Sequence, residues 1–132
     1  KNFMFNFDQD SNPKKISKSI EIIYGLRNFI GNANKFAKDK IFITLKSNND
    51  YTEVIIEDDG EGYPRDIISK IGEPYLKSSS LKNKSKEGLG LGLFIGKTLL
   101  EKNFAFVNCR NSKTRNGAEV VIKWKNKDLF NI

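Results

Sequence analysis

Two asparagines and a lysine lie about one helical turn apart in the chain: Asn28, Asn32 and Lys35. Around them, from about Lys15 to Lys38, apolar residues recur at three- and four-residue spacing, which predicts one amphipathic helix. At 100° per residue the three polar side chains fall within about 60° of one another, opposite the apolar stripe. Amide oxygens so placed can coordinate a hard cation such as Mg²⁺, with Lys35 near the phosphates that complete its shell. A solvated helix face is the alternative.

An acidic, glycine-rich segment, Asp58-Asp59-Gly60-Glu61-Gly62, directly follows a predicted strand. A carboxylate at a strand end can accept a hydrogen bond from a buried amine, and glycine lets the backbone approach a ligand closely. An acidic turn without a ligand is the alternative, because Asp and Gly favour turns.

A third segment, Gly88-Leu89-Gly90-Leu91-Gly92-Leu93, precedes a predicted helix. Three glycines this close together favour a loop whose amide groups bind an anion at the helix N-terminus. A packing contact of small residues is the alternative. The segment is neither a Walker A loop, since only three residues separate Gly92 from Gly96, nor a GxGxxG motif.

The elements that must position these segments follow from periodicity and turn residues. Alternating phenylalanines predict a short strand over residues 3–7, and a loop over 8–13 precedes the long helix. The remaining predictions are strands at 41–46 and 51–58 joined by a turn at 47–50, a short helix at 65–71, a lid at 72–87, a helix at 91–102, strands at 104–110 and 118–124, and a loose tail at 125–132. Helices that alternate with hairpins predict an α/β (α+β) two-layer sandwich, a mixed five-stranded sheet covered on one face by about three helices.

Composition restricts the chemistry further. The 132 residues, 38% of them hydrophobic, form a single domain with no apolar run long enough to span a membrane. The chain has no histidine, which excludes catalytic triads and imidazole bases, and its one cysteine, Cys109, excludes a disulfide framework and is expected to be a small core residue in a reducing compartment. A net charge of +7 allows a nucleic-acid partner, but the lysines are scattered along the sequence, as is usual for a solvated surface.

Because the chain does not begin with Met, we expect it to be part of a longer protein.

Taken in order, these segments resemble the catalytic ATP-binding domain of bacterial sensor histidine kinases, whose Bergerat fold is shared with gyrase, Hsp90 and MutL. The resemblance extends from about Ile16 to Trp124. Its motifs are an N box at 26–36, a G1 box at 58–62, an F box at 72–75 and a G2 box at 88–93, with the lid at 72–87. The F box and residues 93–101 further resemble the RegB/PrrB branch of redox-responding kinases.

The resemblance implies a role for each matched position. Asp58 would accept the adenine amino group, with Gly60 and Gly62 shaping that pocket, and Phe36 would flank the base. Asn32 and Asn28 would hold Mg²⁺, and Lys35 would contact phosphate. The G2-box residues Gly88, Leu89, Gly90, Leu91 and Gly92 would wrap the triphosphate. Two positions depart from the family pattern, Gly31 in place of an acidic residue and Leu89 in place of Thr or Ser.

The resemblance also implies the reaction and the partners. Because the chain lacks histidine, the γ-phosphoryl group of ATP would pass to a histidine on a separate dimerisation domain of the same kinase, and a response regulator would act downstream. The parent would be a homodimeric inner-membrane sensor kinase, with residues 1–132 as its cytoplasmic catalytic domain, monomeric when isolated and without a nucleic-acid partner. Where relatives hydrolyse ATP with a Glu, Asn28 cannot serve as the base. A non-kinase nucleotide-binding module of the same superfamily is the alternative.

Overall fold

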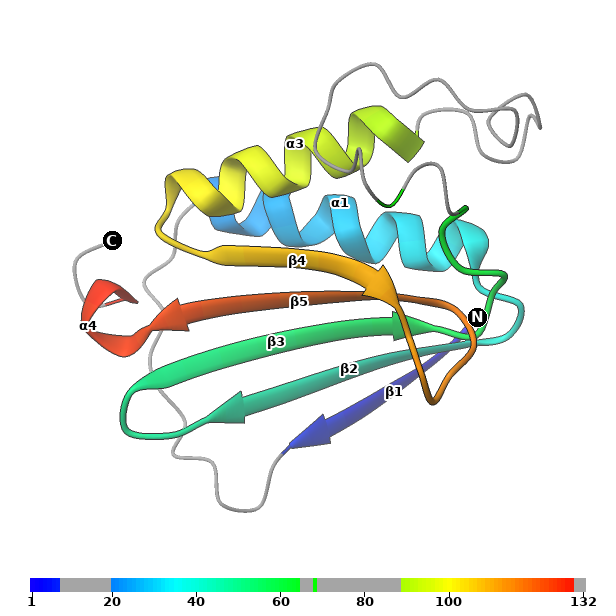
Figure 1. The fold of residues 1–132 in the computed structure, drawn as a ribbon, viewed down its shortest axis with the longest axis horizontal. Helices are drawn as coiled ribbons and strands as arrows, with labels where there is room; N and C mark the ends of the chain where they lie inside the picture. The colour runs from blue at the N-terminus through cyan, green and yellow to red at the C-terminus, as the bar shows by residue number, and fades with distance from the viewer. Residues whose placement is uncertain (8–19, 65–67, 69–88, 130–132) are drawn as a thin grey trace.

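The computed structural model describes residues 1–7, 20–64, 68 and 89–129. Five strands form one sheet in the order β1-β2-β3-β5-β4, and helices α1 and α3 lie side by side over one of its faces (Figure 1). The elements are β1 (Asn2–Phe7), α1 (Ile20–Phe36), β2 (Lys40–Ser47), β3 (Tyr51–Asp58), α3 (Leu89–Lys102), β4 (Phe106–Asn111), β5 (Ala118–Lys125) and α4 (Asn126–Leu129). This arrangement confirms the predicted two-layer sandwich.

The sheet is mixed because β1 pairs parallel with β2, whereas every other neighbouring pair is antiparallel. The predicted hairpins β2–β3 and β4–β5 are both present. In the first, the side-chain oxygen of Asn48 accepts the backbone N–H groups of Asp50 and Tyr51, each at 2.8 Å, which closes the turn. Because β3 and β5 are antiparallel neighbours, the last residues of β3 lie next to the first residues of β5, at the end of the sheet below the C-terminal end of α1 (Figure 1).

The hydrophobic core lies between the sheet and the two long helices. Alternate strand residues face the helices, so Ile41, Ile56, Ile122 and Trp124 are almost fully buried. The helices supply further core side chains from their apolar stripes, namely Ile22, Phe29, Ala33, Leu93 and Leu100.

The two long helices approach each other closely where they carry glycine. A Cβ on Gly25 would lie 2.7 Å from the Leu100 side chain, and a Cβ on Gly96 would lie 2.8 Å from the Phe29 ring. Small residues at these positions let α1 and α3 pack together. This contact fixes the position of α3 relative to the polar face of α1.

Several boundaries differ from the predictions. Helix α3 begins at Leu89, so most of the glycine-rich segment is helical rather than a loop, and the strand predicted from Phe104 begins at Phe106. The loose tail is wrong for residues 126–129, which form α4: the buried Asn126 accepts the Thr52 hydroxyl at 2.7 Å and donates to the Asn48 carbonyl at 2.7 Å. Helix α1 covers 20–36 of the predicted 15–38.

The loop at 8–13, the start of the long helix and the predicted lid at 72–87 lie outside the described residues, as does the predicted helix at 65–71 apart from Ile68. Within the described part of the chain, no helix is long and apolar enough to cross a membrane.

Candidate nucleotide site

Asp58, the last residue of β3, is only 4% exposed. Its Oδ1 atom accepts the N–H of Gly60 at 2.8 Å and the N–H of Ala118 at 3.3 Å, and its Oδ2 atom accepts no hydrogen bond from any described residue. Burial raises the pKa of this carboxyl above its usual value, an effect that the two amide donors only partly offset. The arrangement leaves one oxygen of a fixed, desolvated carboxyl open to a donor on a ligand.

The neighbouring Asp59 has a different function. Its carboxylate accepts the backbone N–H groups of Lys38, Asp39 and Lys40 at 2.8, 3.1 and 3.1 Å. Slight desolvation raises the pKa of this carboxyl, but the amide donors outweigh that effect and the pKa lies below its usual value. Asp59 therefore fixes the connection between α1 and β2, and with it the C-terminal turn of α1 beside Asp58.

The polar face of α1 forms a second wall. Asn32 lies on this face, and its Nδ2 atom is buried without a hydrogen-bond partner among the described residues. Across from it, Gly92 of α3 lies so near that a Cβ there would be 3.1 Å from the Asn32 Oδ1 atom and 3.2 Å from Nδ2. A buried amide without a partner is costly in a folded protein, so this amide is suited to a ligand that supplies the missing contact.

A third wall comes from the loop after β3. Gly62 has φ +81°, a left-handed conformation that favours glycine, and a Cβ there would lie 2.7 Å from the Asn111 Oδ1 atom. The next residue, Tyr63, is 7% exposed, and burial raises the pKa of its hydroxyl well above the usual value. The phenol therefore stays protonated at neutral pH.

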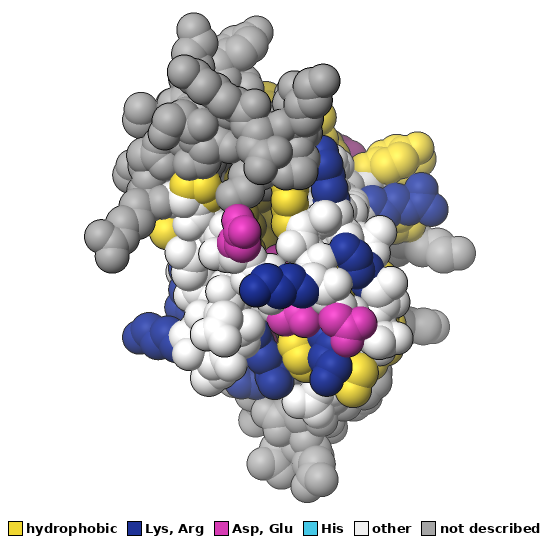
Figure 2. Space-filling view, turned by 90° about the vertical axis from the view of Figure 1, so that its right-hand side faces the viewer, with side chains coloured by type: hydrophobic (Ala, Val, Ile, Leu, Met, Phe, Trp, Pro, Cys, Tyr) yellow, Lys and Arg dark blue, Asp and Glu magenta, His cyan; other side chains and the backbone are white. Residues whose placement is uncertain are grey.

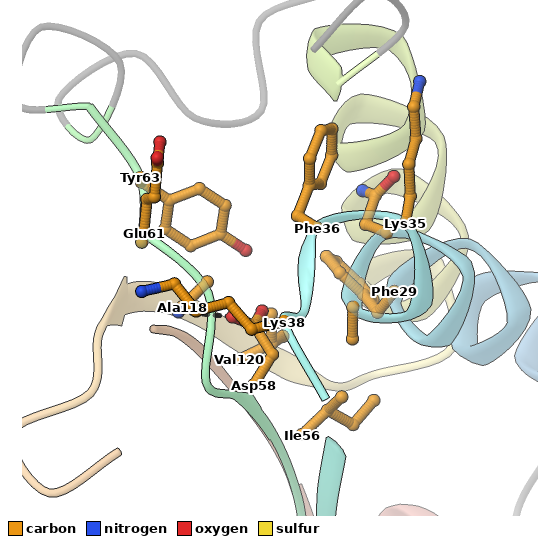
Figure 3. Close-up of a pocket in the computed structure, with 13 residues that line it drawn as sticks. Phe29, Lys35, Phe36, Lys38, Ile56, Asp58, Glu61, Tyr63, Ala118 and Val120 are labelled. Carbon is orange, nitrogen blue, oxygen red and sulfur yellow. Dashed lines mark hydrogen bonds between the residues drawn. The ribbon is translucent and has the colours of Figure 1, made fainter. Parts of the chain in front are cut away.

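These walls enclose a cavity of about 250 Å³. Figure 3 shows Asp58 low in this cavity, Phe36 and Lys35 on the α1 side, and Tyr63 and Glu61 on the opposite side. The Lys35 ammonium lies 5.4 Å from the centre of the Phe36 ring. Seen from outside, hydrophobic side chains occupy a recess flanked by acidic and basic side chains (Figure 2). The lining residues are Phe29, Asn32, Ala33, Lys35, Phe36, Lys38, Ile56, Asp58, Glu61, Gly62, Tyr63, Ala118 and Val120.

The family profile described as histidine kinase-, DNA gyrase B- and HSP90-like ATPase matches residues 18–128. The chain belongs to this ATPase family. It is 41% identical over 108 residues to the sensor histidine kinase RegB of Cereibacter sphaeroides, an alignment that covers 78% of this chain and 23% of that protein. The chain thus spans about a quarter of the length of this curated relative.

Two solved structures illustrate that others share the fold of this domain. The mycobacterial sensor histidine kinase MprB superposes with a TM-score of 0.74 at 21% identity, over 94% of this chain and 82% of that chain. Full-length ShkA in complex with AMPPNP gives a TM-score of 0.70 at 22% identity, over 93% of this chain and 25% of that chain. At this identity the likeness establishes the fold alone.

The cavity brings together five of the twelve site residues predicted from the sequence. Asn32, Lys35, Phe36, Asp58 and Gly62 all line it. Two more adjoin it: Gly60 donates its N–H to Asp58, and Gly92 faces Asn32.

The other predicted positions are placed differently. Asn28 is not among the lining residues, and its Nδ2 atom donates to the Tyr24 carbonyl one turn earlier at 2.8 Å. Gly88 lies outside the described residues, and at positions 89–91 only the helical backbone is described.

Sequence reasoning missed the second half of the site. Tyr63, its partner Asn111 and Gly117 lie between the predicted helices and strands, and none of them is among the site residues predicted from the sequence. Yet a Cβ on Gly117 would lie 2.2 Å from the Asp58 Oδ1 atom, so this glycine is what lets β5 pass beside the carboxyl. The glycine directly before a predicted strand was the one local signal available.

The described residues could hold Mg²⁺ only together with the phosphate oxygens of a bound nucleotide. No cluster of three or more His, Cys, Asp or Glu side chains capable of holding a metal occurs among the described residues. Asn32 lines the cavity and carries one amide oxygen that could coordinate the metal, and Mg²⁺ is commonly held by few protein oxygens together with substrate phosphates. The donor set therefore suits a metal that arrives with a nucleotide.

Proposed function

We propose that this domain binds Mg-ATP in the cavity and passes the γ-phosphoryl group to a histidine on a separate dimerisation domain. The observation that carries the proposal is Asp58, a buried carboxyl held by two backbone amides with its second oxygen open to the cavity. Membership of the ATPase family and the likeness to named sensor histidine kinases support it.

The adenine end of the site follows from Asp58 and its surroundings. The exocyclic amino group of adenine would donate to the open Oδ2 atom of Asp58. The walls around this carboxyl are apolar and aromatic, with Ile56, Val120 and Phe36 among them, which suits a flat base. The reduced exposure to water strengthens the hydrogen bond to the carboxylate.

The phosphate end would lie between α1 and α3. Lys35 supplies positive charge at the cavity, and the amide of Asn32 offers an oxygen. Helix α3 begins at Leu89, three residues before Gly92, so its unpaired N-terminal amides start close to Asn32 and can receive phosphate oxygens. When bound, Mg²⁺ would neutralise part of the triphosphate charge.

In the transfer step, a histidine ring nitrogen would attack the γ-phosphorus, and the bond from that phosphorus to the β–γ bridging oxygen would break to release ADP. The chain contains no histidine, so the acceptor must come from outside it. Asn28 has no carboxylate to activate water, and we expect slow ATP hydrolysis. A response regulator would receive the phosphoryl group next, and the parent protein would act as a dimeric membrane sensor.

Calorimetric titration of the chain with ATP, with and without Mg²⁺, tests the binding step. Asp58→Asn should abolish measurable binding, because an amide donor would face the adenine amino group. Asn32→Ala should remove the Mg²⁺-dependent part of the affinity. Asn34→Ala, on an exposed position of the same helix, is the matched control and should bind as the wild type does. Unaltered binding by Asp58→Asn would refute the proposed site.

Transfer is tested by mixing the chain and γ-labelled ATP with a histidine-bearing dimerisation domain of a RegB-like kinase. Label on the acceptor supports the kinase. Binding of ATP without transfer to any such acceptor supports the alternative, a nucleotide-binding module that acts through conformational change.

A further inference from the structure

Asn111, the last residue of β4, forms hydrogen bonds to the loop after β3 that forms one wall of the cavity. Its Oδ1 atom accepts the Tyr63 N–H at 2.6 Å, and its Nδ2 atom donates to the Tyr63 carbonyl at 3.1 Å. One side-chain amide thus pairs with both polar backbone groups of a single residue 48 positions away. Asn111 itself is not among the residues that line the cavity.

The same strand also contacts the ring of Tyr63. Cys109 lies two residues before Asn111, so both side chains point to the same face of β4. The Cys109 thiol interacts with the Tyr63 hydroxyl, and burial raises the pKa of this thiol to about 12, so that it remains a neutral neighbour. Strand β4 therefore holds Tyr63 at two points, its backbone and the end of its ring.

Tyr63 is in turn the part of the loop that a bound base would meet. Its ring lies in the wall opposite Phe36, with Asp58 low between them (Figure 3). Residues 61–64 belong to no helix or strand, and the hydrogen bonds to the Tyr63 backbone from described residues come from Asn111. Asn111 therefore fixes the backbone of the residue that sets the width of the cavity where a nucleobase would bind.

We propose that Asn111 is a positioning residue for base recognition: by fixing the Tyr63 backbone it sets the distance between the two aromatic walls around Asp58. The inference rests on the proposed function, since it assumes that a nucleotide base occupies the cavity. It assigns to β4, the far edge of the sheet, a role in choosing the base.

The test compares ATP with GTP by calorimetry in the wild type and two variants of the whole chain. Loss of two hydrogen bonds in Asn111→Ala should weaken ATP binding about tenfold. GTP has the same triphosphate, but guanine carries a carbonyl oxygen at the position of the adenine amino group that would donate to Asp58. The weaker affinity of the chain for GTP should therefore change little in Asn111→Ala, and the ATP/GTP preference should fall. Asn111→Asp keeps the acceptor for the Tyr63 N–H and loses the donor, so its preference should lie in between. The added charge acts on both triphosphates and cancels in the ratio.

Asn108→Ala is the matched control, because Asn108 is an exposed residue of the same strand on its opposite face. It should keep the wild-type preference. An equal loss for ATP and GTP in Asn111→Ala would mean general destabilisation and would overturn the inference, as would an unchanged preference. If the wild type itself binds no ATP, the proposed function fails first, and that result is distinguishable because it appears before any variant is compared.

Discussion

Gly117 lies directly against Asp58: a Cβ at position 117 would be 2.1 Å from the Asp58 carbonyl oxygen and 2.2 Å from its Oδ1 atom. Backbone atoms meet here, so no side-chain rotation could relieve the overlap. The start of β5 can pass beside the carboxyl, and Ala118 can donate its N–H to it, only because residue 117 has no side chain.

Gly117→Ala should therefore displace Asp58. We expect the free energy of unfolding to fall by about 1–3 kcal/mol, as in other overpacked sites, and ATP binding to be lost. Urea denaturation and calorimetry measure the two effects. Gly31→Ala is the control: a Cβ at this exposed helical position meets nothing within 4 Å, so the variant should gain about 0.5–1 kcal/mol. A Gly117→Ala protein that is as stable as the wild type and binds ATP would contradict the role assigned to the contact.

Asp58 should lower stability at neutral pH. Because its pKa in the folded state is raised above the unfolded value of 3.8, its contribution to the free energy of unfolding is greatest below pH 3.8 and is lost as the pH rises through the folded pKa. Asp58→Asn should therefore become more stable relative to the wild type between pH 4 and pH 7, while it loses ATP binding. Denaturation at a series of pH values measures this difference, and a constant difference would count against a desolvated carboxyl.

Asp59 provides the opposite comparison. Its pKa is lowered in the folded state, so its contribution to stability is present above pH 3.8 and is lost as the pH falls through the folded pKa. Asp59→Asn should be less stable than the wild type at pH 7, by about 1 kcal/mol from weakened hydrogen bonds to the α1–β2 connection. The loss of stability in Asp59→Asn should shrink in acid. Asp58→Asn should show the opposite trend, because its stability relative to the wild type falls as the pH falls.

Phe104 is expected to destabilise the fold because it adopts a left-handed backbone conformation. It follows α3 with φ 70°, at the position where helices commonly end in glycine, and its side chain is 55% exposed. Phe104→Gly should raise the free energy of unfolding by roughly 1 kcal/mol, because glycine adopts this conformation without steric cost. Asn116 has φ 69°, and Asn116→Gly should change stability by only a few tenths of a kcal/mol, since asparagine tolerates the same conformation. Equal gains in thermal denaturation would show that backbone strain is not the cause.

The sequence predicted the elements well where one periodicity dominates. The apolar stripe of α1 and the two hairpins depend on local alternation and turn residues, and these were placed to within a few residues. The glycine-rich start of α3 was predicted as a loop because glycine is a poor helix former. In the fold, Leu93 is fully buried and Gly96 packs on Phe29, and this tertiary packing outweighs the local preference.

The site was predictable only in part for a related reason. Asn32, Lys35 and Asp58 stand in short patterns whose chemistry is visible in the sequence. Asn111 supports the site through a backbone contact 48 residues away, and no local pattern distinguishes it from any other asparagine before a turn. Residues that hold a wall in place from another strand become visible only when the strands are placed.

A substitution at Gly92 should change the affinity for Mg-ATP without lowering the stability of the fold. It lies in the first turns of α3, where alanine normally raises helix stability by up to about 1 kcal/mol over glycine. A Cβ there would lie 3.1–3.2 Å from the amide of Asn32, a contact that a slight shift of this side chain can relieve. Gly92→Ala should therefore be at least as stable as the wild type, yet bind Mg-ATP less tightly because Asn32 is displaced. Its affinity for ATP without Mg²⁺ should change less.

Gly96→Ala is the control for stability: its Cβ would lie 2.8 Å from the buried Phe29 ring, so this variant should lose stability. If Gly92→Ala binds Mg-ATP as the wild type does, the Asn32 amide does not take part in holding the metal, and the assignment of the phosphate end would have to move to Lys35 and the helix amides alone.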